Sequence, residues 1–172
     1  MILKGFKEKS NKKYLNKLLS QRQVNVAKGR VERLGVIVNI DEFTDLEQFK
    51  TLTKLLNLKE NKVELIAFTN KKNKEDVNSR IKCYNAKDFG RRGVLKEKAL
   101  TDFVNTPFDV LISYYAQNIL ELKLLTAQSK AKFKIGTLQA DERINDLIIK
   151  TKTNEFNLFK NEVFKYLTIL KK

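Results

Sequence analysis

Two patterns of apolar residues alternate along the chain and predict alternating strands and helices. Near-continuous apolar runs, such as LGVIVNI at 34–40 and FDVLIS at 108–113, are typical of strands buried on both faces of a parallel sheet. Between such runs, apolar residues recur every three or four positions, which is the period of an amphipathic helix. Residues 108–136 contain one complete strand, helix and strand unit, and the surrounding chain continues the alternation.

Six strands are predicted in this way. We expect one doubly wound, mostly parallel sheet between two layers of helices, which is a three-layer Rossmann-like α/β fold. The strand at 34–40 should lie centrally, with 62–69 and 80–84 on one side and 108–113, 131–136 and 145–150 on the other. The strand order would then reverse between the first and fourth strands, where folds of this kind bind ligands at strand carboxyl ends.

Helical spacing predicts a helix over 42–58 and a strongly apolar helix over 154–170. In the first 33 residues, an apolar stripe from Tyr14 to Leu19 predicts a short amphipathic helix with Ser10 as its cap. The residues after it lack periodicity and are interpreted as an extended connector. We therefore divide the chain into a basic N-terminal arm, residues 1–33, and a single Rossmann-like domain, residues 34–172.

The charge of the chain favours an anionic partner, and the alternative is a basic protein whose lysines, including those of the arm, are simply solvated. Lys and Arg number 35 against 20 Asp and Glu, which gives a formal net charge of +15. Gly90 and Gly93 bracket two arginines, which predicts a turn whose amides and guanidinium groups hold a phosphate. The candidate nucleic-acid-binding residues are the cations of the arm and of two loops: Lys4, Lys7, Lys9, Lys12, Lys13, Lys17, Arg22, Lys28, Arg30, Arg33, Lys71, Lys72, Lys74, Arg91 and Arg92.

Composition also excludes several kinds of site. The chain has no histidine, so Ser-His-Asp triads, histidine general bases and histidine-ligated metals are excluded. We predict no catalytic residue, no cofactor and no metal. Cys83, the single cysteine, lies in a strand-like run, where a small buried hydrophobe is a more common role than a nucleophile. With no signal peptide and no run long enough to cross a bilayer, we expect a cytoplasmic protein without a membrane partner.

One crevice is a candidate ligand site. Asp41 ends the first strand, and Tyr114 and Tyr115 end the fourth, so all three should meet at the strand-order reversal. Asp41 would act there as an acid, a base or a metal ligand, assisted by Asp45 and Asp88. The alternative roles are a helix cap for Asp41 and core packing for the two tyrosines.

Blocks distributed over nearly the whole chain, including LKGFKEKSNKKY, LGVIVNIDE, FDVLISYY and SKAKFKIG, resemble an uncharacterised family of small basic proteins from Bacteroidota, especially flavobacteria. This resemblance implies a cytoplasmic bacterial protein; the family carries no assigned activity or site residues, so the resemblance assigns no chemistry to this chain. A looser resemblance, over 108–136, is to the N-terminal half of heptosyltransferase-type sugar transferases. It implies a shared half-fold without the activity, because the nucleotide-sugar domain and the catalytic equipment are absent.

Three functions are compatible with these features. The preferred one is a non-enzymatic RNA-binding protein, attached to the ribosome or its precursors through phosphate contacts of the arm and loops. The second is an enzyme or ligand sensor that uses the crevice near Asp41. The third is a scaffold that binds another protein or a second copy of itself through an edge strand or the last helix. The sequence identifies neither a particular RNA nor an oligomeric state.

Overall fold

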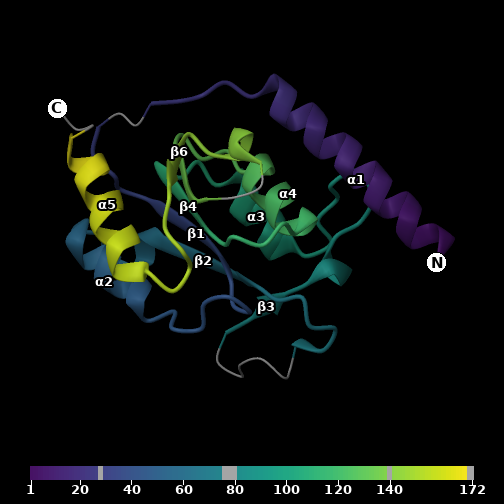
Figure 1. Cartoon of the computed structure of the whole chain (residues 1–172), viewed down its shortest axis with the longest axis horizontal. Coiled ribbons are helices and arrows are strands. Elements are labelled where there is room, and N and C mark those ends of the chain that lie inside the picture. The colour runs from purple at the N-terminus through teal and green to yellow at the C-terminus, as the bar shows by residue number, and fades with distance from the viewer. Residues whose placement is uncertain (27–28, 75–80, 139–140, 170–172) are drawn as a thin grey trace.

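The chain forms a six-stranded, all-parallel sheet between two layers of helices (Figure 1). The computed structural model describes residues 1–26, 29–74, 81–138 and 141–169. The strand order β3-β2-β1-β4-β5-β6 confirms the predicted doubly wound topology, with β1 central. The strands are β1 (Leu34–Asn39), β2 (Val63–Phe68), β3 (Cys83–Tyr84), β4 (Val110–Tyr114), β5 (Lys134–Thr137) and β6 (Leu147–Ile149).

Helices cover both faces of the sheet. Helices α2 (Gln48–Leu55) and α5 (Phe156–Ile169) pack on one face, and α1 (Ile2–Gln21), α3 (Lys98–Asn105) and α4 (Leu120–Gln128) pack on the other. Short 3-10 helices form at η1 (Glu60–Lys62), η3 (Ala86–Asp88) and η4 (Glu142–Ile144). Every residue of β1 is buried, as expected for a strand covered on both sides.

Alternation along β1 assigns its side chains to two separate cores. Val36 and Val38 face the α2 and α5 layer, whereas Ile37 faces the α1, α3 and α4 layer. Near the carboxyl end of the strands, the first core is largely aromatic. There Tyr114 packs edge-on against Phe43 at 5.0 Å and Phe159 at 4.8 Å between ring centroids. This aromatic cluster fills the space beneath the point where the strand order reverses.

Three predicted elements differ clearly from those observed, and the remaining strands and the last helix differ by one to three residues at one or both ends. The helix expected over 42–58 is confined to α2, because the backbone amides of Glu42 and Phe43 both turn back to the carbonyl of Asn39. The strand expected at 80–84 comprises only Cys83–Tyr84 among its described residues. It ends where the Asn85 side chain caps η3.

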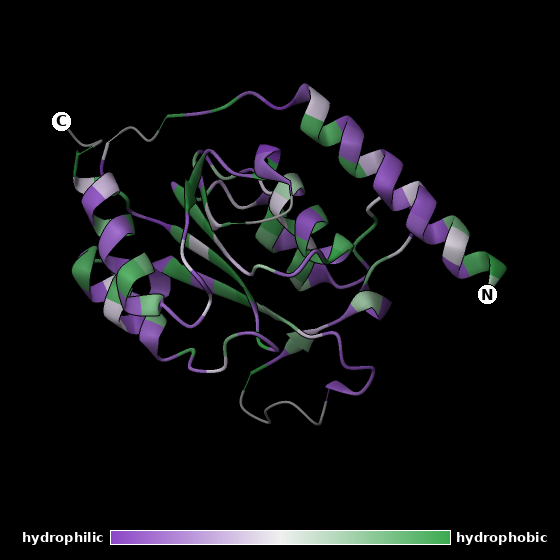
Figure 2. Ribbon diagram, viewed as in Figure 1, coloured by the Kyte–Doolittle hydropathy of each residue, from purple (hydrophilic) through white to green (hydrophobic). Residues whose placement is uncertain are grey.

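The third difference concerns the arm. Helix α1 begins at Ile2 rather than near Ser10, so Ser10 lies inside the helix and the prediction that it caps the N-terminus was wrong. The lysine-rich first half has good intrinsic helix propensity but no apolar stripe to reveal it. Figure 2 shows α1 as mostly hydrophilic, with apolar residues at its N-terminal end.

Candidate nucleic-acid interface

The crevice at the strand-order reversal is occupied by a carboxylate of the chain itself. Glu42 accepts hydrogen bonds from the backbone amides of Ala116 at 3.0 Å and Gln117 at 3.2 Å, just after β4. Its other oxygen accepts from Asn39 Nδ2 at 2.8 Å. Doubly wound folds bind ligands outside the carboxyl ends of the strands at the strand-order reversal. Here Glu42 uses the backbone amides that lie at this position.

Asp41 has a related structural role on the other side of β1. Its carboxylate accepts from Thr69 Oγ1 and from the amide of Asn70, both at 2.7 Å, and so ties β1 to the end of β2. The prediction that Asp41 caps the following helix was wrong, because the N-cap of α2 is Glu47. Asp41 and Glu42 together join the carboxyl end of β1 to both neighbouring strands.

The two tyrosines do not line a crevice. Tyr114 and Tyr115 are both fully buried. The Tyr114 hydroxyl donates to the carbonyl of Thr153 at 2.9 Å, and that of Tyr115 contacts Thr126 Oγ1 at 2.8 Å. Burial raises the pKa of both phenols. Stacking of a ligand on these rings, the role expected for a crevice, is therefore wrong, and core packing is their role.

The two acidic residues predicted to assist Asp41 lie in different parts of the fold. Asp45 accepts from Gln48 Nε2, whereas Asp88 lies in a separate loop cluster beyond β3. Within the described parts of the chain, no three Asp, Glu, Cys or His side chains gather in a metal-binding arrangement. Burial raises the pKa of the Cys83 thiol, which donates to the carbonyl of Ile81, so Cys83 is a buried structural residue.

A buried amide attaches α1 to the turn that carries the two arginines. Asn11 is 1 % exposed, and its Nδ2 donates to the carbonyl of Gly90 while its Oδ1 accepts from the amide of Gly93, both at 2.9 Å. Ser10 Oγ accepts from the amide of Arg92 at 3.2 Å. Within the turn, the amide of Gly90 donates to the carbonyl of Val94. The prediction that the turn's amides hold a phosphate is therefore wrong for Arg92 and Gly93, whose amides bind α1.

Whereas the amides of Arg92 and Gly93 bond to α1, the side chains of Arg91 and Arg92 are both exposed. Arg92 has φ of 54°, a left-handed conformation that non-glycine residues adopt rarely and at a cost of about 1 kcal/mol or more. Contacts from Ser10 and Asn11 hold this conformation in place. The turn thus presents two guanidinium groups on a backbone fixed by α1.

Lysines of α1 border this turn. Residues three and four apart lie on one side of a helix, so Phe6, Lys13 and Lys17 share the side on which Ser10 contacts Arg92. We call this the Ser10 side of α1. Both lysines are exposed. The one acidic residue of α1, Glu8, is paired with Lys12 at 2.6 Å. The Ser10 side and the arginine turn therefore form one basic surface.

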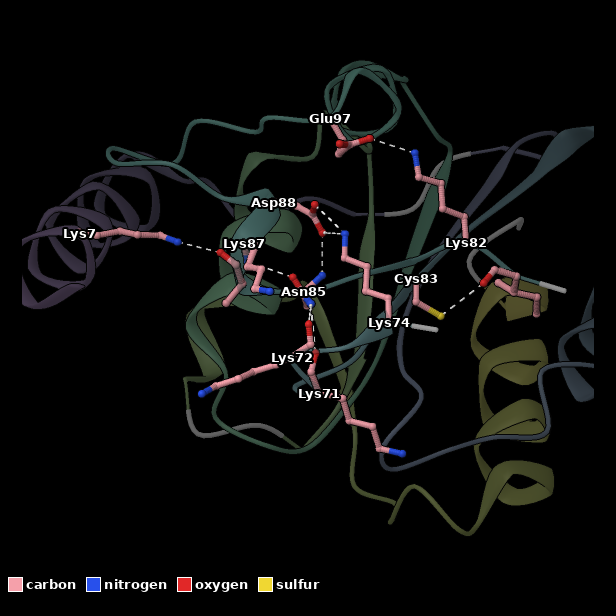
Figure 3. Close-up of polar contacts among 12 residues, drawn as sticks. Lys7, Lys71, Lys72, Lys74, Lys82, Cys83, Asn85, Lys87, Asp88 and Glu97 are labelled. Atoms are coloured by element: carbon pink, nitrogen blue, oxygen red, sulfur yellow. Dashed lines mark hydrogen bonds and ion pairs between the residues drawn. The ribbon is translucent and has the colours of Figure 1, made fainter. Parts of the chain in front are cut away.

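A second polar cluster extends this surface toward the end of β3 (Figure 3). The side-chain Nδ2 of Asn85 donates to the carbonyls of Lys71 at 3.1 Å and Lys72 at 3.3 Å. The backbone amide of Asn85 donates to the carboxylate of Asp88. Lys7 of α1 donates to the carbonyl of Ala86 at 2.7 Å. In Figure 3 the side chains of Lys71 and Lys72 extend away from Asn85. These bonds place the 71–74 loop next to the start of α1.

The structure separates the predicted phosphate-binding residues into two groups. One group is engaged within the fold: Lys7 with Ala86, Lys12 with Glu8, Arg22 with Asp146, Arg33 with Glu64, and Lys74 with Asp88. Arg33 also lies 5.8 Å over the ring of Phe108. The other group is exposed: Lys4, Lys9, Lys13, Lys17, Arg30, Lys71, Lys72, Arg91 and Arg92. Lys28 lies outside the described residues.

Sequence reasoning missed three contributors to this surface. Lys87 and Lys96 are exposed cations on either side of the arginine turn, and each is isolated in the sequence from the basic runs. Phe6 was not assigned to any apolar stripe. Among lysine-rich residues, Asn11 also carried no local signal of burial, since its two partners are 79 and 82 positions away.

A family model described as "Family of unknown function (DUF6913)" matches residues 7–170. The chain belongs to this family. The match includes most of α1, so the arm is part of what DUF6913 proteins share rather than an addition to them. No curated protein and no solved structure matches the chain.

Arg22 has a structural role in this DUF6913 protein, contrary to its predicted place among the phosphate ligands. Its guanidinium pairs with the buried carboxylate of Asp146 and donates to the carbonyl of Arg143. Asp146 also accepts from the amides of Asn25 at 2.8 Å and Lys134 at 2.7 Å. This network fixes the end of α1 against β5. Arg22 was misassigned because its partner lies 124 positions away.

A buried lysine lies beside this network. Lys134 is 5 % exposed, and its Nζ donates at 2.7 Å to the carbonyl of Thr126 in the last turn of α4. Burial, together with the positive charge of nearby Arg22, lowers the pKa of Lys134 to about 8, whereas Asp146 acts in the opposite direction. The ammonium group thus satisfies terminal helix carbonyls at the expense of its hydration.

We predict that Asn11→Ala destabilises the protein. The substitution leaves a carbonyl and an amide of the turn without their partners, which should lower the free energy of unfolding by about 2 kcal/mol. Chemical denaturation monitored by circular dichroism would measure this. Lys9→Ala, an exposed change on the same helix, is the control and should have little effect. Equal free energies of unfolding for the two variants would contradict the role of Asn11 in attaching α1 to the arginine turn.

Lys134 should make stability pH-dependent. The pKa of Lys134 is about 8 in the folded state, against 10.5 for an ordinary lysine. The unfolded chain therefore binds more protons between these pH values, and stability rises with pH. Relative to Lys134→Met, the wild type should gain on the order of 2 kcal/mol between pH 7.5 and 9.5. Denaturation at several pH values tests this.

Lys132→Met is the control for this measurement. Its hydrogen bond to Asp109 raises the pKa of Lys132, so that lysine stays charged in both states over the same range. The difference between wild type and this variant should be independent of pH. If the stability of Lys134→Met ran parallel to that of the wild type at every pH measured, the assignment of a low pKa to Lys134 would be wrong.

Proposed function

We propose that this protein binds RNA through phosphate contacts, has no enzymatic activity of its own, and associates with the ribosome or its precursors. The observation that carries the proposal is the arginine turn, in which a left-handed Arg92 is fixed by α1 next to exposed lysines. Backbone strain that the surrounding structure maintains is characteristic of functional positions. A fixed array of exposed cations loses little conformational freedom when it binds phosphates.

The distribution of charge supports the same conclusion. Cations from α1, the arginine turn and the 71–74 loop lie in segments joined by hydrogen bonds from Asn11, Lys7 and Asn85. Their spacing is therefore set by the folded body rather than by a disordered tail. Such contacts position a nucleic-acid backbone without reading its sequence.

An enzyme that uses the crevice near Asp41 is less well supported. Glu42 occupies the amides after β4, and Asp41 is engaged with Thr69 and Asn70. An anionic ligand would have to displace a carboxylate from its hydrogen bonds and then lie close to its charge.

In the described parts of the chain, no helix has the length and apolar character required to cross a bilayer.

Charge reversal on the Ser10 side should weaken RNA binding. We expect Lys13→Glu with Lys17→Glu to lower affinity for a labelled RNA about tenfold or more and to reduce the dependence of log K on log salt by about 0.7 for each lost contact. Fluorescence anisotropy at several salt concentrations would measure both quantities.

The control changes net charge by the same amount elsewhere. Lys54→Glu with Lys165→Glu alters exposed lysines of α2 and α5, on the opposite face of the sheet. Its affinity should fall much less than that of the Ser10-side variant. Equal losses in both variants would indicate a response to net charge alone and would sink the proposed interface.

Association with ribosomal particles requires a separate measurement. The tagged protein in its own cells should comigrate with ribosomal particles on sucrose gradients at low salt, because phosphate contacts are then least screened. High salt or RNase treatment should release it, and the Ser10-side variant should sediment as a small species at both salts. Sedimentation of the wild type as a small species at low salt would refute the ribosomal part of the proposal.

A further inference from the structure

A hollow of about 590 Å³ lies between the start of α1 and residues 89–96. Its apolar wall is formed by Leu3, Phe6 and Phe89, and its cations are Lys7, Arg91 and Lys96. Its volume is in the range of small-molecule sites. The combination of aromatic surface and positive charge is complementary to a flat, apolar ring that carries an anionic group.

Phe6 and Leu3 are apolar residues of the hollow that the fold leaves exposed, and Phe6 is the aromatic one. Phe89 is completely buried, whereas Phe6 is 55 % exposed on a helix whose other half packs well through Leu15 and Leu19. Large apolar side chains exposed beside a concave, cation-rimmed surface are typical of binding sites. The ring of Phe6 is therefore available for stacking.

Lys7 is held in place at the wall of the hollow. Burial lowers its pKa; among the nearby charges, Glu121 and Asp88 raise the pKa of Lys7, whereas Lys96 and Lys4 lower it. Lys7 donates to the carbonyl of Ala86, which fixes the position of its ammonium group. An anion bound between Lys7, Arg91 and Lys96 would accept charge-assisted hydrogen bonds from them.

We propose that the hollow binds one unpaired nucleotide of a single-stranded RNA, with its base stacked on Phe6 and its phosphates held by Lys7, Arg91 and Lys96. This inference rests on the proposed function and adds a substrate class to it. In a duplex the bases are stacked within the helix, so their faces cannot reach Phe6, whereas an unpaired base can. Stacking accepts any base, which agrees with contacts that do not read sequence.

A tryptophan at position 6 would report the stacking directly. The chain contains no tryptophan, so Phe6→Trp introduces a single fluorophore that is excited apart from the tyrosines. Single-stranded oligouridylate should quench its emission, and the matched RNA duplex should quench it much less. The control is Phe164→Trp, at an exposed phenylalanine of α5 on the opposite face of the sheet, where neither RNA should quench.

Affinity gives the second readout. Phe6→Leu keeps an apolar side chain but removes the ring, and should weaken binding of the single strand about tenfold while binding of the duplex changes less than twofold. Phe164→Leu should change neither. Circular dichroism would verify that each variant retains the wild-type fold.

The outcomes distinguish this inference from the proposed function. A wild type that binds both RNA forms equally, with Phe6→Leu unchanged or equally weakened for both, would overturn the stacking site and leave phosphate binding standing. A wild type that binds neither RNA would overturn both proposals. A blue shift of Phe6→Trp emission on phosphatidylglycerol vesicles, without quenching by RNA, would overturn the nucleotide site in favour of a lipid surface.

Discussion

The position of α1 depends on buried polar bonds more than on apolar packing. Leu15 and Leu19 are its buried hydrophobic residues, whereas Asn11 and Arg22 fix it at two separated points through Gly90, Gly93 and Asp146. Buried polar groups contribute little net stability when paired, but breaking one pair leaves an unsatisfied partner at a cost of about 1 to 3 kcal/mol. Such bonds therefore specify the rotation and register of a helix that apolar contacts alone would leave ambiguous.

The candidate binding surface of this protein does not lie where doubly wound folds usually bind their ligands. In a doubly wound sheet the natural ligand site is the carboxyl edge at the strand-order reversal. Here Asp41 and Glu42 close that edge by bonding to the loops of β2 and β4. The candidate basic surface lies instead around α1 and the arginine turn, so the sheet serves as a support for a surface at the periphery.

Much of the fold could be predicted because its signals are local. Continuous β-branched runs identified the central strands, and their alternation with helical stripes gave the correct strand order. The extent of α1 could not be predicted, since its lysine-rich half has no apolar periodicity. The roles of Asp41 and Arg22 also escaped prediction, because each depends on a partner 28 or more positions away. Core packing of Tyr114, in contrast, was among the predicted roles. A sequence shows which residues carry charge but not which charges the fold has already paired.

The edges of the sheet bear on how the protein behaves when it is crowded. Strand β3 has two residues and β6 has three, so each edge offers very few backbone groups to an approaching strand. Short edge strands are a common protection against edge-to-edge aggregation. A formal net charge of +15 adds mutual repulsion between copies. Copies of the protein at high concentration should therefore resist the joining of their sheets into a fibril.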